Sequence, residues 1–179
     1  MKKYKAISIV VSLADEQPRF LTVRDRRFKD WIFVTGGCRR REVFTPIRTA
    51  LRELEEETRG VVSLTSGEYT DYVFSVPDGP TTELVYHVFV FFVNYSRDEQ
   101  ERQIRRFVDE KNKMNLKKIN KEPGVKRTWD ENDFMSWDTL GEYTARTKRW
   151  DLITNHVIDN PEFEACVSST VRKKFSMNR

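Results

Sequence analysis

The stretch "ALRELEEETRG", residues 50–60, carries four glutamates within a pattern that is typical of a helix. Just ahead of it, Thr45 is a favourable N-cap residue and Pro46 suits the first helical position. Apolar residues then recur at helical spacing. Gly60 can end the helix in a left-handed conformation. The sequence therefore predicts a helix over 46–59.

Three of these glutamates, Glu53, Glu56 and Glu57, stand at positions i, i+3 and i+4, which are neighbours on one helix face. Like charges about 4 Å apart repel by about 1 kcal/mol in water, and by about 4 kcal/mol at an effective dielectric of 20. A divalent cation such as Mg²⁺, which binds oxygen ligands and bridges to phosphates, would offset this repulsion. Arg52 can also pair with Glu56. The alternative is an acidic face that is merely solvated.

The bulk composition favours a single globular domain. The chain has 179 residues, of which 38% are hydrophobic and 34% charged, and this length can bury its own core. No apolar run approaches the roughly 20 residues that span a bilayer, so no membrane association is expected. Cys38 and Cys166 form no disulfide framework, which predicts a cytoplasmic or nuclear protein. A net charge of +4 favours a polyanionic partner.

Alternating and β-branched residues predict a series of strands along the first half of the chain. These strands are expected at 5–13, 19–26, 30–37, 61–64, 70–76 and 81–95. The N-terminus begins like a signal peptide, but it alternates like a strand and lacks a small-residue cleavage site. Strands mixed with helices predict an α/β (α+β) fold.

The second half is more charged. We expect a single domain over 1–165, with a charged insertion at about 96–127 that holds a short helix and then a basic loop. A short strand is predicted within 128–140 and an amphipathic helix over 149–158. The basic tail, 166–179, is typical of a disordered chain end.

With the glycine pair "GG" at 36–37, the acidic helix resembles the Nudix box. That motif has a glycine, five residues, a glutamate, seven more residues and then Arg-Glu-aliphatic-x-Glu-Glu-x-Gly. The second half of the box is matched position for position by Arg52, Glu53, Leu54, Glu56 and Glu57. The order of strand, glycine loop and helix is also the family's order.

The first half of the box departs from the pattern. Counting forward from Gly37 places Arg52 one residue late, and counting back from Arg52 places the early glutamate at Phe44, with Glu42 the nearest carboxylate. Arg59 occupies the place of the closing glycine. The early glutamate is a supporting residue in this family, so the resemblance implies that its loss is tolerable and that the metal-binding half stays intact.

The resemblance implies a Nudix α/β/α sandwich with a mixed β-sheet and the Nudix loop-helix motif. It also implies hydrolysis of a pyrophosphate bond in a nucleoside diphosphate linked to another group, with Mg²⁺ or Mn²⁺ as the cofactor. The predicted catalytic residues are Arg52, Glu53, Glu56, Glu57 and Glu131, and the predicted metal ligands are Glu53, Glu56, Glu57 and the backbone of Gly37.

Two residues are candidates for the general base, Glu131 and Glu83, and the alternative for each is a solvated carboxylate. Glu83 is also a candidate substrate contact. The other predicted substrate contacts are Arg39, Arg40 and Arg41, since guanidinium groups bind phosphates bidentately. Nucleic acid is predicted to bind at Lys111, Lys113, Lys117, Lys118 and Lys121. Both basic clusters could instead be solvated.

The substrate remains open at this stage. The late segment is loosely similar to decapping-like Nudix proteins of large DNA viruses, which implies mRNA cap cleavage with release of m7GDP. The alternatives are hydrolysis of ADP-ribose, dinucleoside polyphosphates or diphosphoinositol polyphosphates, and a non-catalytic Nudix-fold RNA-binding module. Many Nudix proteins dimerise, so a homodimer is a further expectation.

Overall fold

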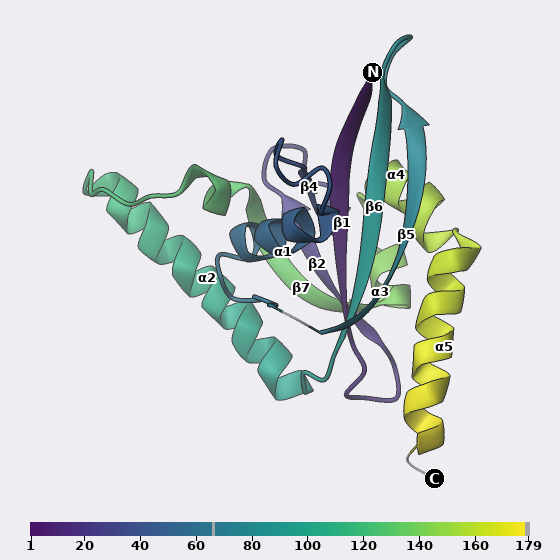
Figure 1. The fold of residues 1–179 in the computed structure, drawn as a ribbon. Helices are drawn as coiled ribbons and strands as arrows, with labels where there is room; N and C mark the ends of the chain where they lie inside the picture. Colours follow the sequence, from purple (N-terminus) through teal and green to yellow (C-terminus); the bar gives the residue numbers. More distant parts are fainter. Residues whose placement is uncertain (66, 178–179) are drawn as a thin grey trace.

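The computed structural model describes residues 1–65 and 67–177, built around a mixed β-sheet (Figure 1). Its strands are β1 (Lys2–Ser12), β2 (Arg19–Asp25), β3 (Trp31–Ile32), β4 (Val34–Gly37), β5 (Glu68–Pro77), β6 (Glu83–Val93) and β7 (Asn132–Thr139). They follow the order β3-β2-β1-β6-β5, with β4 also paired to β1 and β7 to β2. β1 and β6 run parallel, whereas the other pairs are antiparallel. The predicted α+β fold with a mixed sheet is confirmed.

β1 is shared by two branches of the sheet. Near its start it pairs with β4, from Lys5 opposite Gly37 to Ser8 opposite Val34. At its end it pairs instead with β2, where Val11 lies opposite Phe20. The sheet therefore forks on this side of β1, with β4 on one branch and β2, β3 and β7 on the other.

Helices cover both faces of the sheet (Figure 1). They are α1 (Pro46–Glu57), α2 (Arg97–Ile119), the 3-10 helix η1 (Arg127–Asp130), α3 (Leu140–Thr144), α4 (Asp151–Ile153), the π-helical turn η2 (Thr154–Ile158) and α5 (Pro161–Met177). α1 and α2 lie on one face, and α3, α4 and α5 on the other. None of the helices in the described part of the chain combines bilayer-crossing length with an apolar sequence.

The core is divided by the sheet into two clusters because successive strand residues point to opposite faces. In β1, Ala6 and Val10 pack on the side of α1 and α2, whereas Ile7 and Ile9 pack on the side of α3, α4 and α5. Both faces of β1 are therefore buried, and this explains its nearly continuous run of apolar residues.

The charged insertion differs from its prediction. Instead of a short helix and a long loop, α2 runs from Arg97 to Ile119. Ser96 and Glu99 form a capping box that fixes the start of the helix. The few apolar residues suffice to anchor it, because Phe107 and Met114 are both buried. Beyond the body of the protein, the helix continues as a projecting arm (Figure 1).

Two further expectations were wrong. No strand forms at 61–64; Val61 and Val62 leave α1 through two left-handed residues and are buried directly in the core. The tail is helical over 166–177 as part of α5, since Cys166, Val167 and Val171 pack against the sheet; its last two residues, 178–179, lie outside the described residues. The apolar residues of the helical segment are few and lie among charged ones, so its sequence pattern did not indicate a buried helix face.

The anchoring of α2 can be tested by comparing Phe107→Ala with Val108→Ala. Phe107 is 1% exposed and Val108 is 44% exposed. Removing the buried ring should lower the free energy of unfolding by about 3–5 kcal/mol. Truncating the exposed valine should change the free energy of unfolding by about 0.5 kcal/mol or less. Chemical denaturation followed by circular dichroism measures both. Equal losses would contradict the described register of α2.

Candidate active site

α1 carries Glu53 and Glu56 on the side away from the core. Ala50 and Leu54 are fully buried against the sheet and fix the rotation of the helix. Glu53 and Glu56 consequently lie at the rim, with side chains that are 12% and 19% exposed. Glu57 is buried at the end of the helix. The predicted clustering of the three carboxylates on one side of α1 is thus seen, at unequal depths.

Arg52 bridges the carboxylates. Its Nη1 donates to Glu53 Oε1 at 2.6 Å and to Glu56 Oε2 at 3.0 Å, which confirms the predicted pairing four residues along the helix. Its Nη2 donates to the carbonyl oxygen of Gly37 at 3.0 Å. One guanidinium therefore offsets the repulsion between two carboxylates and ties the glycine loop to α1.

The early glutamate of the motif is present after all, and it is Glu42. Its Oε1 accepts from Arg52 Nε at 2.9 Å, and its Oε2 accepts from Arg52 Nη2 at 3.0 Å and from Thr49 Oγ1 at 2.8 Å. These bonds with Arg52 lower the pKa of Glu42 to about 2. The expectation that Phe44 had replaced this glutamate was wrong.

Gly36, and not Gly37, is the glycine of the motif. Counted from Gly36, Glu42 follows after five residues, as the motif requires. The extra length lies between Glu42 and Arg52, where nine residues, 43–51, stand in place of seven. Gly36 is also the glycine that geometry demands, since a Cβ there would lie 2.0 Å from Glu53 Cδ. Side-chain-free backbone is needed at this close approach.

Glu57 has a partner that the sequence did not reveal. Asn132, at the start of β7, donates from Nδ2 to Glu57 Oε2 at 3.1 Å and also to the Glu57 carbonyl at 3.3 Å. Burial raises the pKa of Glu57 well above its usual value, although the bond from Asn132 opposes this. The charges of Glu53, Glu131 and Asp25 raise the pKa of Glu57 further.

Glu131, 74 residues beyond Glu57 in the chain, lies near enough to the α1 glutamates for their charges to act on one another. Partial burial and then the charges of Glu56 and Asp25 raise its pKa. Asp25, at the end of β2, is a further member of this acidic cluster that sequence reasoning missed. Glu83 is placed elsewhere: it opens β6 beside Lys2, whose Nζ lies 3.6 Å from Glu83 Oε2.

The acidic cluster suits a divalent cation in chemistry and charge. It offers carboxylate oxygens, the donors that Mg²⁺ and Mn²⁺ prefer, and mutual repulsion raises the pKa of Glu53 in addition to the larger effect of burial. Among the described residues, no three histidine, cysteine, aspartate or glutamate side chains converge into a ready-made metal site. Arg52 lies between two of the carboxylates instead, so metal binding would require those two side chains to turn from it.

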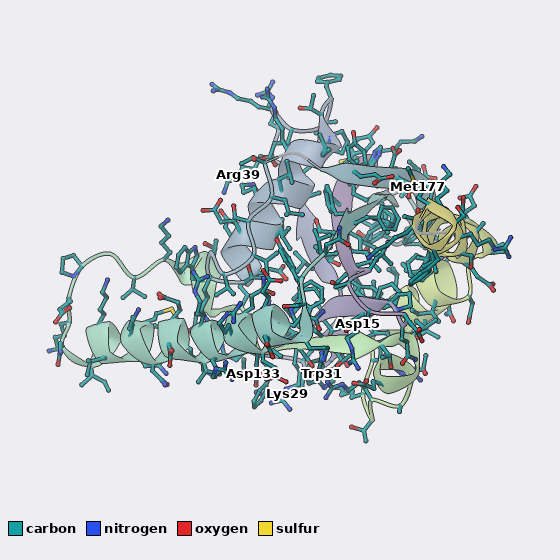
Figure 2. The ribbon with its side chains drawn as sticks, turned by 90° about the horizontal axis from the view of Figure 1, so that it is seen from below. Asp15, Lys29, Trp31, Arg39, Asp133 and Met177 are labelled. Carbon is teal, nitrogen blue, oxygen red and sulfur yellow. The ribbon has the colours of Figure 1, made fainter. Side chains whose placement is uncertain are left out.

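The basic residues near the cluster contribute unequally. Arg39 contacts it, with Nη2 donating to Glu56 Oε1 at 3.3 Å and the backbone N–H donating to Glu42 Oε2 at 3.0 Å. Figure 2 shows Arg39 beside α1. Arg40 and Arg41 are exposed in the same turn. Arg39 is thus the one of the three whose contacts place it at the carboxylates.

Arg59 replaces a glycine of the motif, and its side chain donates hydrogen bonds to three backbone carbonyls of other elements. Its backbone is left-handed, with φ +55°, and its guanidinium is buried. The side chain donates to the carbonyls of Trp129 at 2.7 Å and Asn132 at 2.5 Å, and more weakly to that of Phe107 at 3.4 Å. It also lies over the Phe107 ring at 4.0 Å. The end of α1 is therefore fastened to α2, η1 and β7.

The lysines predicted to bind nucleic acid lie along the second half of α2 and just beyond it. Lys118 has a structural partner, because its Nζ lies 2.5 Å from Oδ2 of the buried Asp130. Lys113 pairs with Glu110 at 2.9 Å. Lys117 and Lys121 are exposed, whereas Lys111 is partly buried. The arm therefore carries a basic surface. Lys118 differs from the other lysines because its ion pair with Asp130 links the arm to the body of the protein.

Comparison with known proteins decides the family. The family model described as NUDIX domain matches residues 3–129. This chain belongs to the NUDIX domain family. Membership together with the retained carboxylates of α1 supports a pyrophosphohydrolase. Comparison with curated proteins gave no match.

Solved structures agree on the Nudix fold at low identity. The NUDIX domain of Shewanella oneidensis NrtR, solved with ADP ribose, is 12% identical with a TM-score of 0.54; the match covers 87% of this chain and 84% of that one. NrtR solved with a 27mer DNA is also 12% identical, with a TM-score of 0.54 and coverage of 85% and 57%. A MutT/nudix family protein from Enterococcus faecalis is 15% identical, with a TM-score of 0.50 and coverage of 78% and 44%. The likeness to viral decapping-like proteins stays a prediction.

The ion pair of Glu42 makes stability depend on pH in this Nudix domain. Because the folded pKa of about 2 lies below the ordinary value of 4.5, its contribution is present above pH 4.5 and is lost as the pH falls toward 2. Glu42→Gln should remove on the order of 2 kcal/mol of unfolding free energy at pH 6, and less at pH 3. Denaturant titrations across this range measure the difference. The exposed Glu55→Gln serves as the control, and a pH-independent loss in Glu42→Gln would contradict the assignment.

Proposed function

We propose that this chain is a Mg²⁺- or Mn²⁺-dependent hydrolase that cleaves a pyrophosphate bond in a nucleoside diphosphate linked to another group. The observation that carries the proposal is the cluster of Glu53, Glu56, Glu57 and Glu131, which combines oxygen ligands with Arg39 at its rim. Carboxylates alone would repel a polyphosphate, so the cluster is useful for this substrate only when a cation is bound.

Each residue has a distinct part in this proposal. Glu53, Glu56 and Glu57 would hold the metal, with the backbone of the glycine loop at Gly37 beside them. A bound divalent cation would neutralise phosphate charge and lower the pKa of bound water. Arg39 is exposed enough to exchange its contact with Glu56 for a phosphate oxygen.

Arg52 keeps its place during that exchange because of Glu42. Its bonds to Glu53 and Glu56 can be given up, while Nε and Nη2 remain bound to the two oxygens of Glu42. A guanidinium held by a second carboxylate does not become an unpaired buried charge, which would be costly. The glutamates are thereby free to turn without loss of the loop structure.

Glu131 is the residue that we propose as the general base. Its raised pKa brings it closer to neutral pH, where a base is most effective. It would accept a proton from the attacking water as the new P–O bond forms. The P–O bond to the leaving phosphate breaks at the same time, and its electron pair stays on the leaving oxygen. Glu83 pairs with Lys2 and so is a weaker candidate.

For the substrate we propose capped RNA, with release of m7GDP, on the strength of the basic arm. The 3-10 helix η1, which carries Arg127, joins the arm to Glu131, so a strand lying along the lysines would lead to the acidic cluster. ADP-ribose is the main small-molecule alternative, because it is the ligand in the NrtR structure; dinucleoside and diphosphoinositol polyphosphates come next. A non-catalytic RNA-binding module would have little reason to keep the carboxylates together.

The proposed activity is tested with Mg²⁺ or Mn²⁺ on cap-labelled RNA, ADP-ribose, diadenosine polyphosphates and inositol pyrophosphates. Glu56→Gln should lower turnover by about 100-fold or more, because even outer-shell residues of metal sites contribute about 10–100-fold. Glu55→Gln, its exposed neighbour, is the matched control. Activity that persists in EDTA, or equal rates for the two variants, would overturn the metal-dependent mechanism.

The role of the arm is tested by salt titration of RNA binding. Neutralising Lys117 and Lys121 to Gln should reduce the slope of log affinity against log salt by about 1.4, or 0.7 for each lost phosphate contact. Lys173→Gln is the control, because α5 lies on the opposite side of the molecule from α2 (Figure 1). An unchanged slope in the double variant would exclude the arm as the RNA track and favour a small nucleotide.

A further inference from the structure

A cavity of about 430 Å³ lies at the fork of the sheet. β1 contributes Lys5, β4 contributes Thr35, and the opposite branch contributes Asp25 and the turn between β2 and β3. Trp150, just before α4, closes another side. A volume of this size is within the range of small-ligand pockets. Because β4 and β2 separate at the fork, the space between them is a direct result of the topology.

Asp25 connects the cavity with the acidic cluster. Thr35, which lines the cavity, directly precedes Gly36, against which Glu53 packs, although the two residues face opposite sides of the sheet. On the other side, the charge of Asp25 contributes to raising the pKa of both Glu57 and Glu131. A group bonded to a diphosphate at the carboxylates can therefore reach into the cavity. This position depends on the proposed function, which supplies the site of the diphosphate.

Two aromatic side chains from separate segments line the cavity. Phe28 is 58% exposed, which is unusual for so large an apolar residue. Trp150 is half-buried and rests edge-on against Tyr86, with ring centroids 6.4 Å apart. Stacking on aromatic side chains is worth about 1–3 kcal/mol per base, and it leaves the edge of the base free to be read. A planar aromatic ring is thus the group that this lining suits.

The polar groups of the cavity select among the bases. Asp25 and Asp30 are acceptors, and each keeps capacity for a ligand: Asp25 Oδ1 accepts the Phe28 N–H at 2.5 Å, and Asp30 Oδ1 lies 3.6 Å from Lys148 Nζ. Lys5 is a donor. Guanine presents two adjacent donors, N1–H and N2–H₂, next to the acceptor O6. Adenine and cytosine have one donor group beside an acceptor, and uracil has a single N–H between two acceptors.

The turn that carries Phe28 and both aspartates is held firmly from behind. Asp133 accepts from Arg24 Nη2 at 2.8 Å and from Lys29 Nζ at 2.6 Å; Figure 2 shows Lys29 and Asp133 together. Although burial opposes it, these bonds lower the pKa of Asp133 to about 2. Arg26 Nη1 also donates to Asp130 at 2.7 Å. The wall of the cavity is therefore fixed before any ligand binds, which favours affinity.

We propose that this cavity binds the guanine ring of the substrate. Phe28 and Trp150 stack on the base, the carboxylate of Asp30 accepts from N1–H and N2–H₂, and Lys5 donates to O6. N7-methylguanine presents the same edge and adds a positive charge that both the aromatic rings and the aspartates favour. Guanine and N7-methylguanine therefore present the same hydrogen-bonding edge to the cavity, and both fit the proposal.

The test is calorimetric binding of GMP, m7GMP, AMP and CMP in the presence of Mg²⁺. These ligands contain no pyrophosphate bond, so binding is measured apart from hydrolysis. We expect GMP or m7GMP to bind at least 10-fold more tightly than AMP and CMP. Preference for m7GMP over GMP by 10-fold or more would identify the methylated base, and equal affinity would identify unmodified guanine. Equal binding of all four would overturn the proposal.

Variants locate the preference in this cavity. Asp30→Asn should remove at least 10-fold of the discrimination against AMP, and Phe28→Ala should weaken all four ligands. Asp159→Asn and Phe175→Ala, both exposed and far along the chain, are the matched controls. If Asp30→Asn and Phe28→Ala bind GMP like the wild type, the site is not this cavity. Phe28 is exposed, so its variant is expected to fold.

The outcomes for base recognition and for catalysis are distinguishable. Glu56→Gln should lose hydrolysis yet keep the preference for GMP over AMP. Hydrolysis by the wild type without any preference among the monophosphates would overturn guanine recognition and leave the proposed function standing. A clear preference for GMP in a wild type that cleaves no substrate would support guanine recognition and overturn the proposed hydrolase function.

Discussion

The site depends on one guanidinium placed among three carboxylates. Arg52 binds Glu42 through two nitrogens and also reaches Glu53 and Glu56. Without this charge, the glutamates of α1 would repel one another within a partly buried space, where Coulomb energies are several times larger than in water. The same bonds hold the loop from β4 onto α1 and draw the Gly37 carbonyl toward the site. Arg52 thus stabilises the loop and the acidic face together.

A second buried arginine links this site to the rest of the fold. Arg59 replaces a small, flexible residue of the motif, and its side chain donates to main-chain carbonyls of Trp129 and Asn132. Asn132 in turn donates to Glu57. Arg59 also reaches the Phe107 carbonyl of α2 at 3.4 Å, so it connects the arm with a proposed metal ligand through Asn132. An arginine with left-handed backbone is tolerated here because its three acceptors and the Phe107 ring compensate for the strain.

The fork of the sheet gives the site its second half. Where β1 passes from pairing with β4 to pairing with β2, a cavity opens that is lined by Asp25. The ion pairs of Asp133 and Asp130 hold the turn that lines this cavity. Asp25, which lines the cavity, also contributes to raising the pKa of Glu57 at the end of α1. The proposed substrate, with a diphosphate, an RNA chain and a base, would use the acidic face, the arm and the cavity in turn.

The sequence by itself determined what depends on local spacing: the helix that begins at Pro46, the carboxylates on one side of it, the pairing of Arg52 with Glu56, and the likeness to the Nudix box. Tertiary structure decided the roles of Glu42 and Asn132, the length of α2 and the position of the cavity. Helical periodicity is a property of neighbouring residues, and it can be read directly. Contacts such as Asn132 with Glu57 join strands and helices far apart in the chain, and only the packing of the sheet brings them together.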